Sequence, residues 1–349
     1  MELTDNIHIK CFKPLSSPRQ VKEDLPQPQA VEQLVLETRN AVQKIIVRED
    51  SRCLAVVGPC SVHDSKAALE YAAKLRTLQE EVADRVLLVM RAYFEKPRTI
   101  LGWKGLIYDP HMDGSYDIED GLRRARRVLL GITELGVPTA TEFLDPIVPQ
   151  YLADLVSWAA IGARTTESQI HRQMVSGLSM PIGFKNATDG TLQSAIDAIK
   201  AASSAHSFMG IDRNGQVVIA ETLGNRYGHV VMRGGKEGPN YGEEYVAFTE
   251  ALLRRARIDN GLLIDCSHDN SNKDYRLQGK VCQDVIRQRQ AGNSRIVGVM
   301  LESFLNEGKQ AFDKPENLQY GVSVTDSCLG WAETETLVRE LAAVSPASV

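Results

Sequence analysis

Short apolar runs recur along most of this chain, and segments with the spacing of amphipathic helices separate them. Several runs are continuous rather than alternating, which is typical of parallel strands buried on both faces. Strands that alternate with helices indicate an α/β fold with a parallel sheet. The ten runs are Cys53–Val57, Val86–Arg91, Thr139–Phe143, Ala159–Ala163, Ile182–Lys185, Phe208–Ile211, Val217–Ala220, Val230–Arg233, Leu262–Cys266 and Ile296–Leu301.

Two of these runs are closely spaced, with Asn214-Gly215 between them. Asn-Gly between short apolar runs is a strong hairpin signal, so we expect an inserted β-hairpin at about 206–222. The eight remaining strands predict a (β/α)8 TIM barrel. The span from Arg52 to Glu302 covers 251 residues, and about 250 are typical of that fold. An open doubly wound sheet is the alternative, but no G-x-G-x-x-G follows the first run.

The N-terminal segment differs from the rest of the chain. Four prolines within residues 1–30 predict an irregular, extended arm, with a disordered tail as the alternative. Apolar residues at helical spacing then predict a helix over 31–48. We therefore divide the chain into an N-terminal arm and helix, residues 1–50, and a barrel domain, residues 51–349. Further helices are expected at 65–82, 121–135, 190–202, 243–257 and 274–290.

The composition excludes several classes of protein. The 349 residues carry a formal net charge of −5, which argues against a nucleic-acid binder that works by bulk charge. No apolar stretch approaches the ~18 residues of a membrane span, and the N-terminus does not resemble a secretory signal. Six cysteines in a chain of this length indicate cytosolic thiols rather than a disulfide framework. We expect a cytoplasmic protein.

Polar residues lie at or just after the ends of the eight barrel strands. The carboxyl ends of barrel strands carry the active site in this fold. All eight are of types that bind metals or anions or transfer protons. In chain order they are Cys60, Arg91, Glu142, Arg164, Lys185, Arg233, His268 and Glu302.

Four of these eight residues are cations, although the protein is acidic overall. Arginine binds phosphate or carboxylate bidentately, and lysine adds a compact charge. A solvated surface cation is the alternative for each residue taken singly, but the group predicts a small polyanionic ligand. The cations are Arg91, Arg164, Lys185 and Arg233, with Lys96, Arg98 and Lys236 just downstream of strand ends.

The other strand-end residues predict a metal site. Barrel closure places the last strand beside the first, so Cys60, His268 and Glu302 are expected to be neighbours, and Asp326 could return over the same edge. Such a mixed S/N/O set suits a divalent first-row metal. The alternatives are a small buried hydrophobe for Cys60, a core histidine for His268, and Cys328 as the sulfur ligand.

Two other groups are expected to have structural roles. The arginine-rich run over residues 123–127 is expected to be the solvated face of a helix. His63, His111 and His229 are expected to be structural.

Long motifs follow one another in a characteristic order. They are GPCSVHD (58–64), RAYFEKPRT (91–99), GWKGLIYDPHMDGSYDI (102–118), IGARTTESQIHR (161–172), GFKNATDG (183–190), RGGKEGPNY (233–241), DCSHDNSNKDY (265–275), VMLESF (299–304) and YGVSVTD (320–326). With these motifs the chain resembles the class I 3-deoxy-D-arabino-heptulosonate 7-phosphate (DAHP) synthases of the type regulated by aromatic amino acids. Such enzymes condense phosphoenolpyruvate with erythrose 4-phosphate and release phosphate, the first step of the shikimate pathway.

The resemblance also implies roles for individual residues. It implies a TIM barrel with an N-terminal extension and an inserted hairpin. Lys96 is our candidate for protonating the aldehyde oxygen, and Glu142 for orienting the water that adds to phosphoenolpyruvate. The implied ligands of a divalent metal (Mn²⁺, Fe²⁺, Co²⁺ or Zn²⁺) are Cys60, His268, Glu302 and Asp326. The implied ligands of phosphoenolpyruvate are Arg91, Lys96, Arg164, Lys185 and Arg233, and Arg98 and Thr99 would hold the sugar phosphate. The implied catalytic residues are Lys96, Glu142, Lys185 and Asp326.

An effector pocket beside the hairpin, completed by the N-terminal arm of a neighbouring copy, is implied in the same way. This arrangement requires a homodimer or homotetramer. Gly210 replaces the serine of phenylalanine-sensitive relatives and leaves room for a hydroxyl or a larger ring, so we expect tyrosine as the effector, with tryptophan as the alternative. The matching positions are Asp5, Ile9, Pro149, Gln150, Met174, Leu178, Ser179, Phe208, Gly210 and Val218.

Some residues depart from the family pattern. Ala187 replaces a usual glycine, Asp269 replaces a small residue, and an extra residue lies near Glu237-Gly238. Three other functions stay open at this point. They are an aldolase with Lys185 as Schiff-base nucleophile, a sister synthase that uses arabinose 5-phosphate, and an amino-acid sensor without catalysis.

Overall fold

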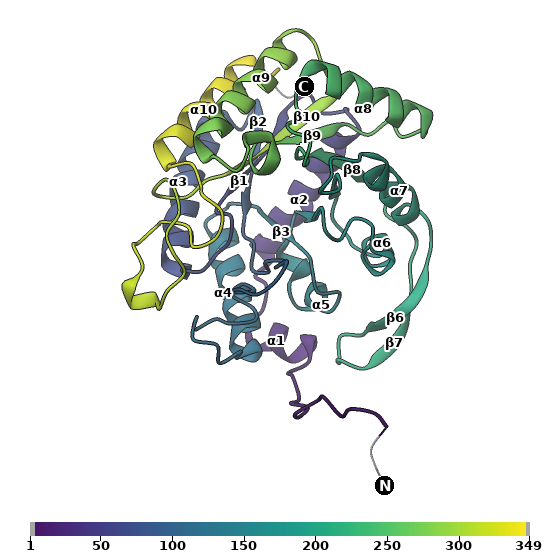
Figure 1. The fold of residues 1–349 in the computed structure, drawn as a ribbon, viewed down its shortest axis with the longest axis vertical. Helices are drawn as coiled ribbons and strands as arrows, with labels where there is room; N and C mark the ends of the chain where they lie inside the picture. Colours follow the sequence, from purple (N-terminus) through teal and green to yellow (C-terminus); the bar gives the residue numbers. More distant parts are fainter. Residues whose placement is uncertain (1–3, 347–349) are drawn as a thin grey trace.

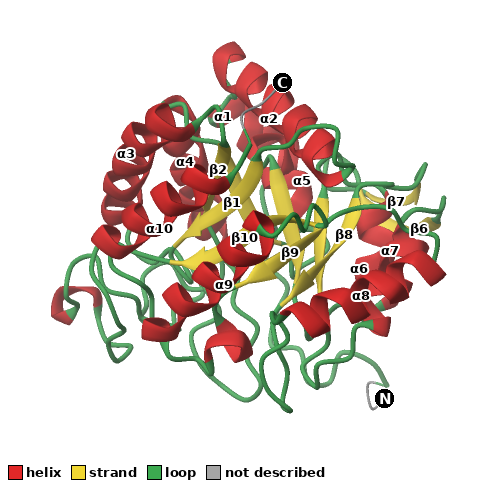
Figure 2. Cartoon of the chain, turned by 90° about the horizontal axis from the view of Figure 1, so that it is seen from above, coloured by secondary structure: helices red, strands yellow, loops and turns green. Residues whose placement is uncertain are grey.

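The computed structural model describes residues 4–346 and contains a closed parallel barrel of eight strands. Figure 2 shows these strands at the centre of the molecule with helices around them. The closed ladder confirms the predicted TIM barrel and excludes the open sheet. In order around the barrel the strands are β1 (Cys53–Gly58), β10 (Ile296–Glu302), β9 (Leu262–Asp265), β8 (Gly228–Met232), β5 (Ile182–Lys185), β4 (Trp158–Ile161), β3 (Thr139–Glu142) and β2 (Val86–Arg91).

The strands are nearly completely buried, as their continuous apolar runs predict. The first and last residues of each predicted run lie within two residues of the first and last residues of the observed strand. Closure pairs β1 with β10, and its register sets Gly58 opposite Glu302. The carboxyl ends of the first and last strands therefore meet at one edge of the barrel mouth.

Ten α-helices are present in the described part of the chain, most of them outside the barrel (Figure 1). The predicted helix at 65–82 is matched at both ends. The helices are α1 (Pro18–Asp24), α2 (Gln29–Ile46), α3 (Ser65–Val82), α4 (Ile118–Glu134), α5 (Val148–Leu152), α6 (Gln169–Ser176), α7 (Gln193–Ala202), α8 (Glu243–Arg255), α9 (Gln278–Gln290) and α10 (Trp331–Val344), with short 3₁₀ turns at Ala153–Leu155, His268–Ser271, Tyr275–Leu277 and Pro315–Asn317.

Helix α2 closes the amino-terminal end of the barrel. Its residues Val42, Ile45 and Ile46 are wholly buried and belong to one apolar cluster with inward-facing strand residues such as Leu54. The backbone N–H of Gly261, just before β9, donates to the carbonyl of Ile46. The α2 residues therefore fill the amino-terminal end of the barrel interior.

The expectation of an irregular arm over residues 1–30 is wrong in part, because α1 lies within it. Pro18 occupies the first turn of α1, where a missing N–H costs nothing. The Ser17 side chain accepts a hydrogen bond from the N–H of Gln20 and caps the helix. The expected domains also include residues 1–3 and 347–349, which lie outside the described residues.

The expectation of a solvated arginine face on the helix over 118–134 is also wrong for one residue. Arg126 is wholly buried. Its guanidinium donates to both carboxylate oxygens of Asp154, at 2.9 and 2.8 Å, and to the carbonyl of Leu25. The side chain thus ties α4 to the segment between α1 and α2.

The predicted hairpin is present as strands β6 (Ser207–Ile211) and β7 (Val217–Glu221). It stands at the periphery of the molecule in Figure 1, apart from the barrel. Strand β5 pairs directly with β8, so the hairpin interrupts the sequence and not the ladder of barrel hydrogen bonds. No described helix is long and apolar enough to cross a membrane.

Candidate active site

Three candidate metal ligands converge where the first and last strands meet. One ligand atom from each of Cys60, Glu302 and Asp326 lies within 4.8 Å of the other two. The Cys60 thiol is 3.6 Å from Asp326 Oδ2. Cys60 and Glu302 are brought together by the β1–β10 register, and Asp326 returns on the loop before α10.

His268 approaches the same group from β9. Its Nε2 atom lies 3.8 Å from Glu302 Oε1, and the two residues line one narrow cleft with Asp326. Its Nδ1 atom lies 2.9 Å from a carboxylate oxygen of Asp265. A thiol, an imidazole and two carboxylates at this spacing fit a divalent first-row metal. A further carboxylate behind the imidazole, here that of Asp265, is the usual support for a metal-binding histidine.

Lys96 lies directly against this group. Its Nζ atom is 3.1 Å from the Cys60 sulfur and 3.3 Å from the Cys60 carbonyl oxygen. Burial raises the pKa of the Cys60 thiol to about 12 in the metal-free protein. Burial opposes the charged form of Lys96, but the neighbouring anionic groups outweigh it and raise the pKa of the ammonium. A charged proton donor therefore stands beside the candidate ligands.

Arg91 occupies the barrel interior beside Glu302. It is wholly buried, its guanidinium lies 3.1 Å from Glu302 Oε1, and it stacks on the ring of Tyr93 at 3.9 Å. Burial opposes its charge, while Tyr93 and Glu302 raise its pKa, so Arg91 stays cationic.

Two further predicted cations are buried and paired with carboxylates. Lys185, at the end of β5, lies 3.0 Å from Asp265 Oδ2. Burial lowers the pKa of Lys185, but Asp265, Tyr93 and Glu142 together outweigh burial, and the pKa is raised. Arg233 is ion-paired with Asp269, the residue that departs from the family pattern. The extra carboxylate therefore contacts a candidate substrate residue.

The remaining predicted residues lie nearer the rim. Glu142 is 7% exposed at the end of β3. Its carboxylate packs over Gly162, where a Cβ would lie 2.4 Å from Oε1, so a larger residue there would displace the Glu142 carboxylate. Arg164, Arg98 and Thr99 are exposed, and Arg98 Nε donates to the carbonyl of Trp103. The structure does not bring these three into contact with the buried group.

Sequence reasoning missed three residues that support the site. Asp265 links His268 to Lys185. Its place at a strand end, as the first residue of the motif DCSHDNSNKDY, was the signal that could have revealed it. Gln278 holds the backbone of Glu302 through two hydrogen bonds of 3.0 and 2.9 Å. Glu95 accepts hydrogen bonds from the N–H groups of Leu144 and Asp145, and burial raises its pKa to about 8.

A separate cavity of about 460 Å³ lies between the hairpin, α5 and the carboxyl-terminal end of α6. Asp5 and Ile9 lie on the exposed arm, and Ser179 and Val218 are not among the lining residues. Six of the ten positions expected to bind an effector do line it: Pro149, Gln150, Met174, Leu178, Phe208 and Gly210.

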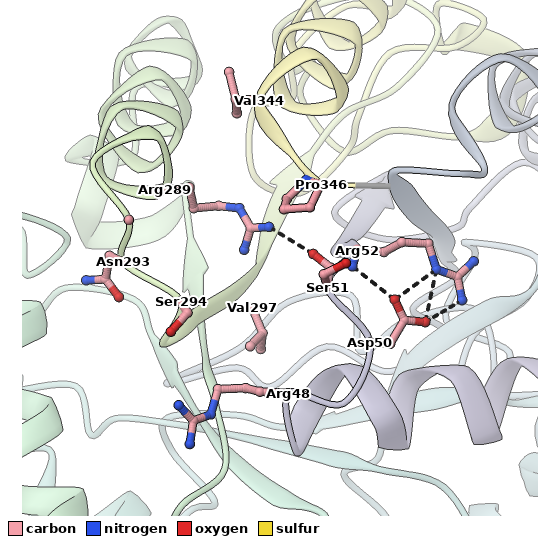
Figure 3. A pocket seen from close by; sticks show the side chains of 11 residues that line it. Arg48, Asp50, Ser51, Arg52, Arg289, Asn293, Ser294, Val297, Val344 and Pro346 are labelled. Carbon is pink, nitrogen blue, oxygen red and sulfur yellow. Dashed lines mark hydrogen bonds and ion pairs between the residues drawn. The ribbon is translucent and has the colours of Figure 1, made fainter. Parts of the chain in front are cut away.

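A third cavity, of about 260 Å³, lies at the amino-terminal end of the barrel. Figure 3 shows that the guanidinium groups of Arg48 and Arg52 point in different directions. Arg52 is paired with Asp50 at 2.7 Å and Arg48 with Asp259 at 2.6 Å. Arg48 and Arg52 are neutralised and do not converge, and the third arginine of the lining, Arg289, donates to the backbone carbonyls of Ser51 and Ile296. The cavity therefore lacks the combination of cations and candidate metal ligands found at the barrel mouth.

The comparison with protein families settles which group this site belongs to. The DAHP synthetase I family matches residues 28–339. The chain belongs to this family.

Individual relatives agree with the family assignment. The Tyr-sensitive phospho-2-dehydro-3-deoxyheptonate aldolase of Escherichia coli K12 is 52% identical over 97% of this chain and 95% of its own length. The Trp-sensitive protein of the same strain is 49% identical over 98% of both chains. The solved structure of phospho-2-dehydro-3-deoxyheptonate aldolase from Francisella tularensis SCHU S4 has a TM-score of 0.94, 46% identity, and coverage of 96% of this chain and 98% of that one.

Proposed function

We propose that the protein condenses phosphoenolpyruvate with erythrose 4-phosphate to give DAHP and inorganic phosphate. The observation that carries this proposal is the contact between Arg91 and Glu302, because it joins a buried anion-binding cation to a candidate metal ligand. A site for an anionic substrate and a site for a metal thus share one wall. The buried cations and the candidate metal ligands are both present, which argues against a sensor that has lost catalysis.

The residues that would hold the metal are Cys60, His268, Glu302 and Asp326. When bound, a divalent metal ion supplies Lewis-acid polarisation of the aldehyde oxygen. Lys96, 3.1 Å from the Cys60 sulfur, would donate a proton to that oxygen as the C–C bond forms between C3 of phosphoenolpyruvate and the aldehyde carbon.

The buried cations would bind phosphoenolpyruvate: Arg91 from the end of β2, Lys185 from the end of β5 and Arg233 from just after β8. Arg164, Arg98 and Thr99, on the exposed rim, would close over the substrates, the last two at the sugar phosphate. Holding two anions together is the main contribution of such a cation group. Glu142 would orient the water that adds at C2, after which the C–O bond to phosphate breaks.

The environment of Lys185 argues against the Schiff-base alternative. An amine nucleophile needs a lowered pKa, and the contact with Asp265 raises that of Lys185 instead. Borohydride trapping in the presence of substrate separates the two mechanisms, because a covalent adduct on Lys185 would contradict a metal-assisted condensation.

The cavity beside the hairpin would bind an aromatic amino acid, with tyrosine preferred and tryptophan as the alternative. Tyr-, Phe- and Trp-sensitive relatives are 52%, 51% and 49% identical to this chain, so overall similarity does not choose among them. Gly210 carries the preference. A Cβ there would have only ordinary contacts at 3.8 Å, so the missing side chain leaves usable space.

A second copy of the chain would complete this cavity, in a homodimer or homotetramer. The arm exposes Ile7, Ile9 and Phe12, and the hairpin exposes Met209 and Ile219. Large apolar side chains gathered in this way are typical of interaction surfaces. The arm carrying Asp5 and Ile9 would cover the hairpin of the neighbour.

Phosphate release from phosphoenolpyruvate plus erythrose 4-phosphate tests the proposed reaction. We expect release to stop after chelation and to return with Mn²⁺. Full activity in the chelated protein would contradict the metal assignment. Activity with arabinose 5-phosphate and none with erythrose 4-phosphate would indicate the sister synthase.

A further inference from the structure

Asp265 is the last residue of β9 and is wholly buried at the carboxyl end of the barrel. Its two carboxylate oxygens have different partners. Oδ1 accepts hydrogen bonds from the backbone N–H and the hydroxyl of Ser267, at 3.1 and 2.7 Å. Oδ2 lies 2.9 Å from Nδ1 of His268 and 3.0 Å from Nζ of Lys185. One carboxylate thus contacts residues from both halves of the site.

The contact with His268 fixes which ring nitrogen can bind a metal. Nδ1 faces Asp265 Oδ2 and also lies 2.7 Å from the Ser267 hydroxyl oxygen. The hydroxyl donates to Asp265 Oδ1, so its oxygen can accept from Nδ1, and both neighbours favour a proton on that nitrogen. Nε2 is then left with a free lone pair, and it points to the side where Glu302 Oε1 lies, 3.8 Å away.

The contact with Lys185 fixes the direction of the ammonium group. Lys185 is 3% exposed, and Asp265 is its ion-pair partner. A lysine side chain has four rotatable carbons and only a point charge at its end, so a fixed counterion is what determines where that charge lies.

We propose that Asp265 is a positioning residue shared by the two halves of the site. It holds His268 with Nε2 presented to a metal ion, and through the same oxygen it holds the Lys185 ammonium towards phosphoenolpyruvate. The second part rests on the proposed function, whereas the first concerns metal binding alone. Asp265 itself would contact neither the metal nor the substrate.

The test compares Asp265→Asn with Asp269→Asn. Asparagine has the shape of aspartate, but its amide NH₂ would face a donor in either orientation, either Ser267 or the pair His268 and Lys185. Asp269→Asn removes the same charge one residue after His268, at a carboxylate that is paired with Arg233 and not with the imidazole. It is therefore a matched control for a general loss of negative charge.

The measurement is Mn²⁺ binding to the chelator-treated full-length protein, followed by the electron paramagnetic resonance of free Mn²⁺. We expect Asp265→Asn to raise the dissociation constant by about 10–100-fold, as for other outer-shell partners of metal-binding histidines. We expect Asp269→Asn to leave it unchanged. The visible spectrum of the Co²⁺-loaded protein should change in Asp265→Asn only, and the KM for phosphoenolpyruvate should rise in both variants.

Wild-type Mn²⁺ affinity in Asp265→Asn would overturn the proposal, and so would an equal loss of affinity in Asp269→Asn. If Asp265→Asn does not fold, Ser267→Ala decides, because it removes a partner of both Asp265 and His268. A several-fold weaker affinity is expected there, and an unchanged one would overturn the proposal. If wild-type protein shows no condensation while Asp265→Asn still loses Mn²⁺ affinity, the proposed function fails and the role of Asp265 at the metal site stands.

Discussion

Arg91 and Glu302 form an ion pair of 3.1 Å inside the barrel, where the two side chains are 0% and 2% exposed. They come from β2 and β10, which lie on either side of β1. Removing one partner of a buried pair leaves an uncompensated charge, whereas an exposed pair would contribute little.

Arg91→Met is therefore expected to reduce both activity and stability. In the metal-free protein we expect a loss of about 3–5 kcal/mol in the free energy of unfolding, because Glu302 is left buried and unpaired. Urea titration measures this, and phosphate release should fall at least about 100-fold as an anchor of the substrate is lost. Arg91→Met combined with Glu302→Gln should recover part of the stability but not the activity. A variant as stable as wild type would show that the pair is not a buried charge pair in solution.

The two buried cysteines near Asp326 are expected to behave differently. Cys60 is in the ligand group, whereas the sulfur of Cys328 faces the backbone carbonyl of Asp326 at 3.7 Å. Cys60→Ser should weaken Mn²⁺ binding by at least about tenfold, because a main ligand counts for no less than its outer-shell partners. Cys328→Ser should not. The reverse result would make Cys328 the sulfur ligand.

Gly210→Ser tests the effector preference. The backbone at Gly210 is not left-handed, and a Cβ would lie 3.8 Å from Ala220 and from the ring of Phe208, so the variant should fold normally. We expect inhibition by tyrosine to weaken by about tenfold as the hydroxyl loses its space. Inhibition by phenylalanine should strengthen, and turnover without effector should not change. Unaltered inhibition by all three aromatic amino acids would show that Gly210 does not select the effector.

His229 is expected to make the barrel sensitive to acid. It is wholly buried, accepts a hydrogen bond of 3.1 Å from Trp158 Nε1, and has its pKa lowered to about 4 by burial. His229 is protonated near pH 6.5 in the unfolded chain, but only near pH 4 in the folded chain. This contribution is therefore complete above pH 6.5 and is lost as the pH falls to 4, by roughly 3 kcal/mol.

The His229→Gln variant isolates that contribution. Glutamine keeps an acceptor for Trp158 and a donor for the carbonyl of Tyr227, but it does not titrate. Urea titrations at pH 7 and pH 4.5 should show a smaller loss of stability in the variant than in wild type. Equal losses would mean that His229 is not the group responsible.

Deletion of residues 1–13 tests the proposed role of the arm. The deletion removes Ile7, Ile9 and Phe12, all of them exposed, and leaves α1 intact. We expect the mass measured by light scattering to decrease and effector inhibition to be lost, with phosphate release retained. A truncated protein with the wild-type mass and full inhibition would place the subunit contact elsewhere.

Sequence patterns predicted the barrel well because each strand is buried on both faces. A continuous apolar run such as Val86–Arg91 marks such a strand with little ambiguity, whereas helix signals depend on context. Pro18 resembles a helix breaker until its position in the first turn is known. The burial of Arg126 depends on Asp154, 28 residues away in sequence and on another element, so no local pattern could reveal it.

The residues at the strand ends of the site were predictable from the sequence, but a residue that supports them was not. Reading the strand ends found Cys60, His268 and Glu302, because barrel geometry places those ends together. The same reasoning missed Asp265, because this residue was counted as the last part of its strand. Its partners Lys185 and His268 were identified as site residues without any reference to a carboxylate between them. Which carboxylate supports which metal ligand depends on the distances between strand ends. The spacing of residues along the chain does not give these distances.

The hairpin is joined to the chain between two strands that pair with each other without it. Residues that line the cavity beside it, such as Phe208 and Gly210, are therefore outside the barrel ladder, whereas Lys185 and Arg233 are held at or next to its strand ends. Substitutions in the hairpin can alter which small molecule is recognised without moving a catalytic side chain. Descendants of one ancestral enzyme could thus acquire different control while sharing a single chemistry.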